Sequence, residues 1–576
     1  MSESLEIFEF SNHKEEKFLA GGYKSTGSQL AWMKGKSPNI IRYNMPNSKA
    51  TRACLAQKPQ YLLLYSYNDA EQPLQLFLID RNRRWSKEKM IATGYENPHH
   101  DDYVVLYLTK EIPLAKLLVQ PLRDFASKKL MFLPRFNPFV LSGSEILQAL
   151  APKKFTFVDL FAGAGGLSEG FVRAGFQPIA HVEMDHYACD TLRTRAAFHY
   201  LKENGRLDEY KQYLIEKKPN EDGSKLWNKV PKKVIDSVIH ETIGSNTIQS
   251  IFERIDALRE DRPVDIIIGG PPCQAYSIVG RARMGEKVKE DPRNNLYKFY
   301  VQFLERYQPK MFVFENVPGI RTAKNGEAFR GLQEAIKKAG YEMVPMVQLA
   351  SEHGVLQNRQ RVIIVGWKED KPYYYPQLPV ELNHYTIRKD LFADLPTLKA
   401  GEGSLCGKVE YTKDLSEMTY LQQSGIRGVL DFTTQHIARP NNLNDREIYC
   451  MAVQAWNKNK HRLQYTEIPA DHQRHKNKST FLNRFQVVDP DGYSHTLVAH
   501  IAMDGHYYIY PIENPTPDNV RSITIREAAR IQSFPDDFFF EGSRSAAFKQ
   551  IGNAVPVILA ERVGKEILRM LKGEPL

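Results

Sequence analysis

The sequence predicts an α/β protein whose central domain is a doubly wound, largely parallel sheet. From about residue 155 to 367, apolar strands alternate with helical segments, as in consecutive β-α-β units. Two of these strands are followed by glycine-containing turns: residues 157–160 lead into a glycine-rich turn, and residues 264–268 lead into Gly-Gly-Pro-Pro. In open α/β sheets the loops after the carboxyl ends of the strands carry the chemistry. We therefore expect the functional site at these two turns.

The first 150 residues precede this alternation and are predicted to form an additional α/β or α+β domain. Strands are expected at residues 61–67, 74–79 and 103–108, and basic, aromatic-rich segments at 23–42 and 81–89. Because aromatic rings beside arginine can stack on bases, an accessory DNA-binding domain is our preferred interpretation. An ordinary core with a basic surface is an equal alternative. A protein-interaction domain comes next, and a fused nuclease last, since no clear metal-binding acidic cluster followed by lysine is present.

The first glycine turn indicates a cofactor that carries a nucleoside. Glycines in residues 161–168 let backbone amides approach a ligand, and the following helix start adds partial positive charge. Glu183 follows the next strand, where an acidic residue holds ribose hydroxyls in nucleotide sites. The spacing is not G-x-G-x-x-G, and no Gly-Lys-Ser/Thr follows, which excludes a P-loop. An ordinary turn is the alternative, and the acidic residue about twenty positions later argues against it.

The second turn places Cys273 on a stiff loop at the mouth of a buried strand. A cysteine attacks as the thiolate, of which a free cysteine holds only a few per cent at neutral pH, so such a site must activate it. Glu315 ends the next apolar strand. The alternative is a buried structural cysteine, the usual state of an isolated Cys.

Two stretches interrupt the alternation of strands and helices. Residues 199–260 form a charged, lysine-rich, helix-prone insertion, for which we favour a solvated helical excursion over a DNA contact. Residues 368–496 contain the basic runs 458–462 and 472–478, interleaved with Asn, Gln and aromatic residues. That mixture fits phosphate anchoring combined with direct readout of bases.

Composition indicates the class of partner and the cellular compartment of the protein. The chain has 576 residues, a formal charge of +10 and a pI near 9.0, which suit a polyanionic partner. Five scattered cysteines without Cys-x-x-Cys spacing indicate a reducing compartment and no structural zinc or other metal. Residues 1–18 lack the apolar core of a signal peptide, and no run approaches membrane-spanning length.

Further motifs complete an ordered set. Glu-Asn-Val-Pro occupies residues 315–318, Gln-Asn-Arg-Gln-Arg occupies 357–361, and two later segments, 523–535 and 550–556, follow a long gap. Together with the two glycine turns, this order closely resembles the DNA (cytosine-5)-methyltransferase family of bacterial restriction–modification systems. The resemblance covers residues 155–198, 264–367 and 494–570. It implies a Rossmann-like methyltransferase domain dependent on S-adenosylmethionine in residues 151–367 and 497–576, and a smaller target recognition domain in residues 368–496.

The resemblance implies covalent catalysis, because carbon 5 of cytosine is a poor nucleophile. Cys273 would add to ring carbon 6 while Glu315 donates a proton to ring nitrogen 3. Carbon 5 would then take the methyl group of S-adenosylmethionine, and loss of its proton and of the thiol would give 5-methylcytosine. Arg361, and behind it Arg359, match the paired arginines of the family that face the base and the catalytic loop.

The same resemblance implies the residues that bind the cofactor. They are expected to contact the adenine, the ribose and the methionine part, and to close the cleft from the C-terminal region: Phe161, Gly163, Gly165, Gly166, Leu167, Glu183, Met184, Pro271, Leu296, Asn553 and Val555. The family's acidic residue for the adenine amino group has no clean match in residues 238–248. Asn246 could replace it, although an ordinary turn asparagine is at least as good an interpretation.

A cytosine in duplex DNA must rotate out of the stack before a thiol can reach it. The basic, glycine-containing loop 277–293 is expected to close over the DNA backbone and to place Gln274 near the vacated position. Thr496 matches a family threonine that holds the backbone beside the flipped nucleotide. The remaining expected DNA contacts are Ser277, Arg281, Arg283 and Lys476.

Two alternatives remain open. One branch of the same family methylates a tRNA cytosine, and a non-catalytic DNA-binding regulator could use the same scaffold. The long recognition segment and the N-terminal domain favour double-stranded DNA. The expected setting is a monomer in the bacterial cytoplasm, associated with the nucleoid and not with a membrane, that modifies DNA beside a separately acting restriction endonuclease. The recognition sequence cannot be inferred from these residues, because base choice depends on which side chains reach the groove.

Overall fold

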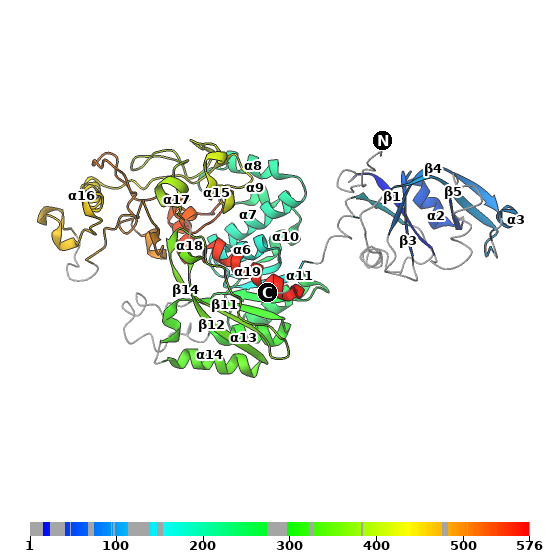
Figure 1. Ribbon diagram of the computed structural model, residues 1–576, viewed down its shortest axis with the longest axis horizontal. Coiled ribbons are helices and arrows are strands. Elements are labelled where there is room, and N and C mark those ends of the chain that lie inside the picture. The colour runs from blue at the N-terminus through cyan, green and yellow to red at the C-terminus, as the bar shows by residue number, and fades with distance from the viewer. Residues whose placement is uncertain are drawn as a thin grey trace. The chain divides into compact units, whose positions relative to one another are not determined.

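The computed structural model of the chain is divided into two units, Met1–Lys153 and Lys154–Leu576 (Figure 1). No described helix is long and apolar enough to cross a membrane. The residues that the structure describes are 15–23, 41–46, 48–66, 74–93, 95, 98–112, 139–143, 146, 154–272, 296–322, 326–381, 384–474, 482–503 and 505–574.

The first unit is built on a six-stranded mixed sheet with the order β2-β5-β4-β3-β1-β6. Its side chains enclose a cluster that includes Leu62, Leu64, Trp85 and Val105. The strands predicted at 61–67, 74–79 and 103–108 are confirmed, although β4 and β5 are longer than expected. The elements are β1 (Lys17–Tyr23), β2 (Ile41–Pro46), α2 (Lys49–Ala56), β3 (Tyr61–Ser66), β4 (Gln75–Ser86), α3 (Lys87–Ala92), β5 (Asp102–Ile112) and β6 (Phe139–Ser142).

The second unit contains the predicted doubly wound sheet, with the order β12-β14-β11-β10-β7-β8-β9. The pairs from β11 through β9 are parallel, whereas β14 runs antiparallel to both β11 and β12. This arrangement confirms the fold class predicted from the sequence. The strands are β7 (Thr156–Leu160), β8 (Gln177–Glu183), β9 (Val238–His240), β10 (Ile266–Gly269), β11 (Met311–Asn316), β12 (Tyr341–Leu349) and β14 (Gln360–Lys368).

Helices cover both faces of this sheet, and strand residues alternate between the two sides. Phe157, Ile266 and Ile268 pack with helices α6 (Gly166–Ala174) and α19 (Val557–Lys572). Val158 and Ile267 pack on the other side with α11 (Ile248–Arg259), α13 (Leu296–Tyr307) and α14 (Glu327–Lys338). Burial on both faces explains why these strands are uniformly apolar in the sequence.

Small residues let the C-terminal segment approach the helix that follows the first glycine turn. A Cβ atom at Gly166 would lie 2.5 Å from the carbonyl oxygen of Val555, and one at Gly170 would overlap Ala560. The start of α6 and the residues before α19 are therefore in direct backbone contact. This contact brings residues 553–555 beside the glycine turn, although nearly 400 residues separate the two segments in the sequence.

The insertion at 199–260 is not the solvated excursion that we favoured, and that prediction is wrong for its first half. Phe198, Tyr210 and Tyr213 are buried in a cluster with Phe432 and Phe539 from the later part of the chain. The hydroxyl of Tyr213 donates to Glu541 at 2.6 Å, and the ammonium of the buried Lys217 pairs with the same carboxylate. The helices are α7 (His186–Glu203), α8 (Leu207–Glu216), α9 (Ser224–Trp227) and α10 (Lys232–Asp236).

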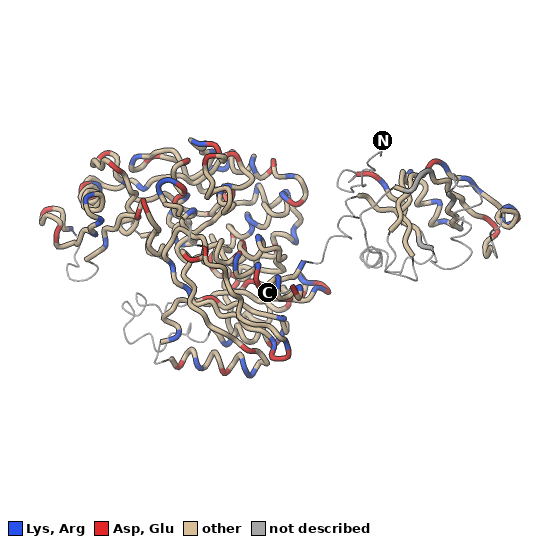
Figure 2. Tube along the Cα trace, in the orientation of Figure 1, with Lys and Arg blue, Asp and Glu red and all other residues tan. Residues whose placement is uncertain are grey.

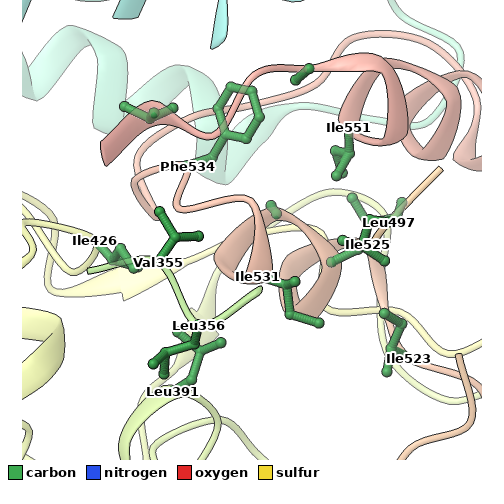
Figure 3. Close-up of a cluster of buried hydrophobic side chains, with 14 of the residues drawn as sticks. Val355, Leu356, Leu391, Ile426, Leu497, Ile523, Ile525, Ile531, Phe534 and Ile551 are labelled. Carbon is green, nitrogen blue, oxygen red and sulfur yellow. The ribbon is translucent and has the colours of Figure 1, made fainter. Parts of the chain in front are cut away.

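Mostly short elements lie before and after β14, many of them around a second core. Figure 3 shows this cluster, in which Leu356, Leu497, Ile531 and Ile551 come from separate segments of the chain. The elements are η4 (Pro318–Arg321), η6 (Ala350–Glu352), β13 (Gln357–Asn358), η7 (Ile387–Leu391), β15 (Val409–Glu410), η8 (Leu415–Glu417), α15 (Thr419–Gln423), β16 (Phe432–Thr433), α16 (Leu443–Asn459), η9 (Tyr465–Glu467), η10 (Ala470–His472), β17 (Ser494–His495), η11 (Ala499–Ala502), α17 (Ile525–Ile531) and α18 (Arg544–Asn553).

Buried arginines connect these short elements. Arg530 pairs with Asp394 and with Asp536, in each case at 2.6 Å, and Arg521 pairs with Glu527 at 2.7 Å. Arg526 is fully buried and donates to main-chain carbonyls. Arg521, Arg526 and Arg530 therefore brace this region. The domain boundaries predicted at residues 367 and 496 remain predictions.

Candidate active site

Four strands of the second unit end side by side at the carboxyl edge of the sheet. The last residues that pair among these four strands form one row of cross-strand partners: Val182, Leu160, Gly269 and Phe314. The residues that follow them along the four strands are Glu183, Phe161, Gly270 and Glu315. Neighbouring strands lie about 4.8 Å apart, so the two glutamates stand about 14 Å from each other along this edge.

The order in which strands are added to the sheet reverses at β7, and this reversal locates the site. From β7 the strands continue through β8 to β9, after which the chain returns and places β10 on the other side of β7. Such a switch point leaves a crevice outside the carboxyl ends of the strands. The loop after β7 and the loop after β10 border it, and these are the two turns singled out in the sequence.

The glycine turn is held in shape by Glu183. Its carboxylate accepts hydrogen bonds from the backbone N–H groups of Gly163 at 2.8 Å, Met184 at 2.9 Å and Asp185 at 2.8 Å. Two carboxylate oxygens offer about four acceptor positions, so three bonds leave room for a ligand hydroxyl. Glu183 can therefore order the turn and still accept from a ribose.

The turn keeps its backbone open toward a ligand. Phe161, Gly163 and Gly165 all have positive φ, at 57°, 55° and 84°, which turns the chain sharply after β7. A Cβ atom at Gly163 would meet no other atom within 4 Å among the described residues, so there is open space in front of this backbone. The space at Gly163 fits the methionine part of S-adenosylmethionine, and the remaining acceptor position on Glu183 fits its ribose.

Asp159 lies beneath this turn and was not anticipated as part of the site. It is 1% exposed, and its Oδ2 atom has no hydrogen-bond partner among the described residues. Burial, and next the charge of Glu183, raise the pKa of Asp159 well above its ordinary value. A carboxyl group whose pKa is raised in this way can remain protonated.

The other predicted cofactor residues are distributed around the same edge. Met184 is 61% exposed directly after Glu183, Pro271 and Val555 are buried, and Leu296 is half-buried at the start of α13. Asn553 is exposed at the end of α18, next to the turn that contacts Gly166. Leu167 is buried, and its side chain packs into the core beneath α6.

The loop that leads to Cys273 is held against the end of β11. The side-chain amide of Asn316 donates to the carbonyl oxygen of Pro271 at 3.3 Å. A Cβ atom at Gly270 would lie 2.7 Å from the Oε2 atom of Glu315, so only glycine fits there without displacing the carboxylate. Neither contact follows from the sequence pattern, although Asn316 lies within the Glu-Asn-Val-Pro motif.

Glu315 is fixed on its other side by Arg361. The guanidinium Nε of Arg361 lies 2.7 Å from Oε1 of Glu315, and the two side chains are 11% and 13% exposed. The pairing of β11 with β14 produces this contact, because Asn316 lies opposite Val362. The structure therefore brings Glu315, Arg361 and the start of the Cys273 loop together.

Arg359 lies elsewhere, in the protein interior. It is fully buried, and its guanidinium donates to the main-chain carbonyls of Leu497, Gly552 (3.2 Å) and Ala554 (2.9 Å). These contacts give Arg359 a bracing function between chain segments, and its assignment to the base or the catalytic loop stays a prediction.

Several predicted residues lie outside the described part of the chain. They are Cys273, Gln274, Ser277, Arg281, Arg283 and Lys476. Thr496 is described, and its hydroxyl donates to the carbonyl oxygen of Asn358 at 2.7 Å, next to the paired strands β13 and β17. Asn246 is exposed in a turn, and its role stays a prediction.

Comparisons with known proteins agree on one family. A family model described as "C-5 cytosine-specific DNA methylase" matches residues 155–218 and 228–569. Type II methyltransferase M.Bpa9945I of Bacillus paralicheniformis is 36% identical over 447 residues, which cover 72% of this chain and 99% of that protein. M1.HphI of Haemophilus parahaemolyticus is 27% identical over 73% of this chain and 88% of its own length. M.XorII of Xanthomonas oryzae pv. oryzae is 30% identical over 73% and 85%.

Proposed function

The chain belongs to the C-5 cytosine-specific DNA methylase family and is a DNA (cytosine-5)-methyltransferase, and we propose that the edge of strands β8, β7, β10 and β11 is its active site. The observation that carries this proposal is the row of strand ends that aligns Glu183, the glycine turn, Gly270 and Glu315. A nucleoside site and a candidate proton donor thus share one edge of one sheet.

S-adenosylmethionine is the methyl donor in this proposal and supplies an electrophilic methyl group when it is bound. Glu183 would accept from the ribose, and the backbone around Gly163, which has open space in front of it, and around Gly165 would face the methionine part. Phe161 and Met184 would pack on the adenine. Asn553 and Val555 would close the site from the C-terminal segment, which the contact of Val555 with Gly166 supports.

Cys273 would add through its sulfur to ring carbon 6 of the cytosine, and Glu315 would give a proton to ring nitrogen 3. Carbon 5 then carries the electron pair that takes the methyl group, after which loss of its proton and of the thiol restores the ring. Arg361 would hold Glu315 and lie near the oxygen on ring carbon 2, because its contact with Glu315 places it beside that carboxylate. A cation there also favours the thiolate form of the nucleophile.

Duplex DNA would lie across the same edge and along the segment 368–496. Thr496 supports this placement, since it is bonded to Asn358, three residues before Arg361. The target cytosine must leave the stack to reach Glu315, which requires a few kcal/mol. The loop 277–293 would close over the DNA backbone during that step.

The first unit is proposed to be an accessory DNA-binding domain. Residues 1–153 contain 21 Lys and Arg and 15 Asp and Glu, a formal charge of +6 out of the chain's total of +10. The guanidinium of Arg81 lies 4.9 Å above the ring of Tyr107, and Arg83 is exposed on the same strand. Acidic residues are interspersed along β4 and β5, as Figure 2 shows for this unit, so phosphate contact would fall to the basic residues between them.

The proposed setting is the modification half of a bacterial restriction–modification system, in the cytoplasm and on the nucleoid. A separately acting restriction endonuclease would be the partner in function, and the methyltransferase itself would act as a monomer.

Transfer of labelled methyl groups from S-adenosylmethionine into duplex DNA and into a tRNA transcript tests the substrate. We expect label in 5-methylcytosine of the duplex and none in the tRNA. The variant Glu315→Gln is the control, since it retains a side chain of the same shape but cannot donate the carboxyl proton. Label in the tRNA alone would show that tRNA, and not DNA, is the substrate. If a folded protein labelled neither nucleic acid, a non-catalytic regulator would be the remaining interpretation.

A further inference from the structure

Gln357 and Arg359 both point into the protein interior from the segment between β13 and β14. Both side chains are fully buried, whereas Asn358 and Gln360 are exposed. This alternation follows from the extended backbone, in which every second residue shares a face. Two long polar side chains therefore enter one apolar core side by side, and each must find hydrogen-bond partners there.

The first set of partners is the turn that contains Thr496. The side-chain oxygen of Gln357 accepts from the N–H of Leu497 at 2.9 Å, and the guanidinium of Arg359 donates to the carbonyl oxygen of the same residue. Leu497 is thus held at both of its main-chain polar groups. Since Thr496 precedes it directly, the position of the proposed DNA-contacting hydroxyl is set by these two side chains.

The second set of partners is the turn that contains Asn553. Arg359 donates to the carbonyl oxygens on both sides of that residue, Gly552 at 3.2 Å and Ala554 at 2.9 Å. Gln532 reinforces the turn by donating to Ile551 at 2.7 Å. Gln357 donates in turn to Gln532 at 2.9 Å, which closes a buried network.

The two turns also touch each other directly. A Cβ atom at Gly552 would lie 2.5 Å from the N atom of Ala499 and 2.5 Å from the carbonyl carbon of Val498. Figure 3 shows Leu497 and Ile551 in the same buried cluster, on separate segments. A shift of either turn must therefore be accompanied by a shift of the other or by loss of the Arg359 contacts.

We propose that Arg359 is a positioning residue that couples cofactor binding to DNA binding, by holding the Asn553 turn and the Thr496 turn on one guanidinium. This inference rests on the proposed function of those turns. When the Asn553 turn is ordered, Arg359 is fixed in position to hold the Leu497 carbonyl. When the Thr496 turn is ordered, Arg359 is fixed in position to hold the carbonyls of Gly552 and Ala554. Each ligand then tightens the other by the same factor, because coupling between two binding sites is reciprocal.

The test measures the dissociation constant of S-adenosylhomocysteine with and without a saturating target duplex, by calorimetry on the full chain. The wild type is expected to bind the cofactor product at least about 10-fold more tightly with the duplex, within the range usual for coupled sites. Arg359→Lys keeps the charge but loses the planar fork that reaches three carbonyls. Its ratio is expected to fall below about 2.

Arg526→Lys is the matched control. Arg526 is equally buried and also donates to three carbonyls, those of Thr434, Pro535 and Phe538, none of which lies in either turn. We expect this variant to lose stability while keeping the wild-type ratio. A purely structural role of Arg359 would lower both affinities and leave the ratio unchanged, as in the control.

Gly552→Ala tests the same coupling if Arg359→Lys does not fold. The backbone of Gly552 is helical, so alanine is compatible with it, and the added methyl group forces the two turns apart. A ratio that stays at the wild-type value in the folded variants, or a wild-type ratio near 1, would overturn the inference. The proposed function fails separately, if the wild type binds neither S-adenosylhomocysteine nor duplex DNA.

Discussion

Gly270→Ala tests the contact between the Cys273 loop and Glu315. The added Cβ atom would lie 2.7 Å from the Oε2 atom of Glu315, whereas ordinary contacts begin at 3.4 Å. The carboxylate must therefore move by about 0.7 Å. Gly270 is not among the glycines with positive φ, so alanine causes no backbone strain there.

This displacement is expected to affect activity far more than stability. The obstructing atom is the end of a flexible side chain, so the free energy of unfolding should change by less than about 1 kcal/mol. A misplacement of about 1 Å at a catalytic centre lowers rates by about 100-fold. For 0.7 Å we expect the methyl-transfer rate to fall by roughly 10- to 100-fold.

The assay is single-turnover methyl transfer to a target duplex, combined with thermal unfolding and with binding of the duplex and S-adenosylhomocysteine. Gly331→Ala is the matched control, because its Cβ atom would lie 2.8 Å from the hydroxyl oxygen of Tyr297, again the end of a side chain, but on helix α14. The control should keep its rate. A folded Gly270→Ala enzyme with a rate within twofold of wild type would refute the assigned position of Glu315.

Glu183→Gln should weaken binding of S-adenosylhomocysteine by about 10- to 100-fold, because hydrogen bonds to a charged group contribute about 1.5–3 kcal/mol. The amide would also present N–H donors to the N–H groups of Gly163, Met184 and Asp185. An unchanged dissociation constant in calorimetry would contradict this prediction. Burial, and next the charge of His199, lower the pKa of His181 from 6.5 to about 4, so below pH 6.5 the unfolded chain binds a proton that the folded chain does not. This histidine should therefore remove about 2 kcal/mol of stability between pH 7 and pH 5. In urea unfolding at pH 7 and pH 5, the His181→Gln variant should lack this contribution to the loss of stability. Lys476→Ala should weaken duplex binding and reduce the slope of affinity against salt by about 1, and an unaltered slope would exclude a phosphate contact.

The fold of the second unit followed from local pattern. Uniformly apolar strands such as residues 264–268 and 312–314 are buried on both faces, and the glycine-containing turns after residues 160 and 268 mark the carboxyl edge of the sheet. The acidic residue after the second strand was found in the same way, because Glu183 meets Gly163 through a cross-strand relation that spacing alone predicts. Hydrophobic periodicity and turn residues are enough to predict such contacts when the two residues lie on adjacent strands of the sheet.

Long-range partners were not predictable in the same way. The charged residues of 199–260 were expected in solvent, yet Lys217 is buried because Glu541, more than 300 residues later, pairs with it. Arg359 resembles a substrate-facing arginine by motif, and only the tertiary structure shows its contacts with Leu497, Gly552 and Ala554. A side chain's charge does not reveal its burial when the compensating groups come from distant segments.

The most direct test of the account is covalent trapping with a duplex in which 5-fluorocytosine replaces the target cytosine. The fluorine cannot leave as a proton does, so methyl transfer should stop at a stable protein–DNA adduct through Cys273. Mass spectrometry of the digested adduct should locate the bond at that residue, and Cys273→Ser should bind the duplex without forming it. Absence of an adduct in an enzyme that methylates ordinary DNA, or near-normal turnover by Cys273→Ser, would contradict covalent catalysis by this cysteine.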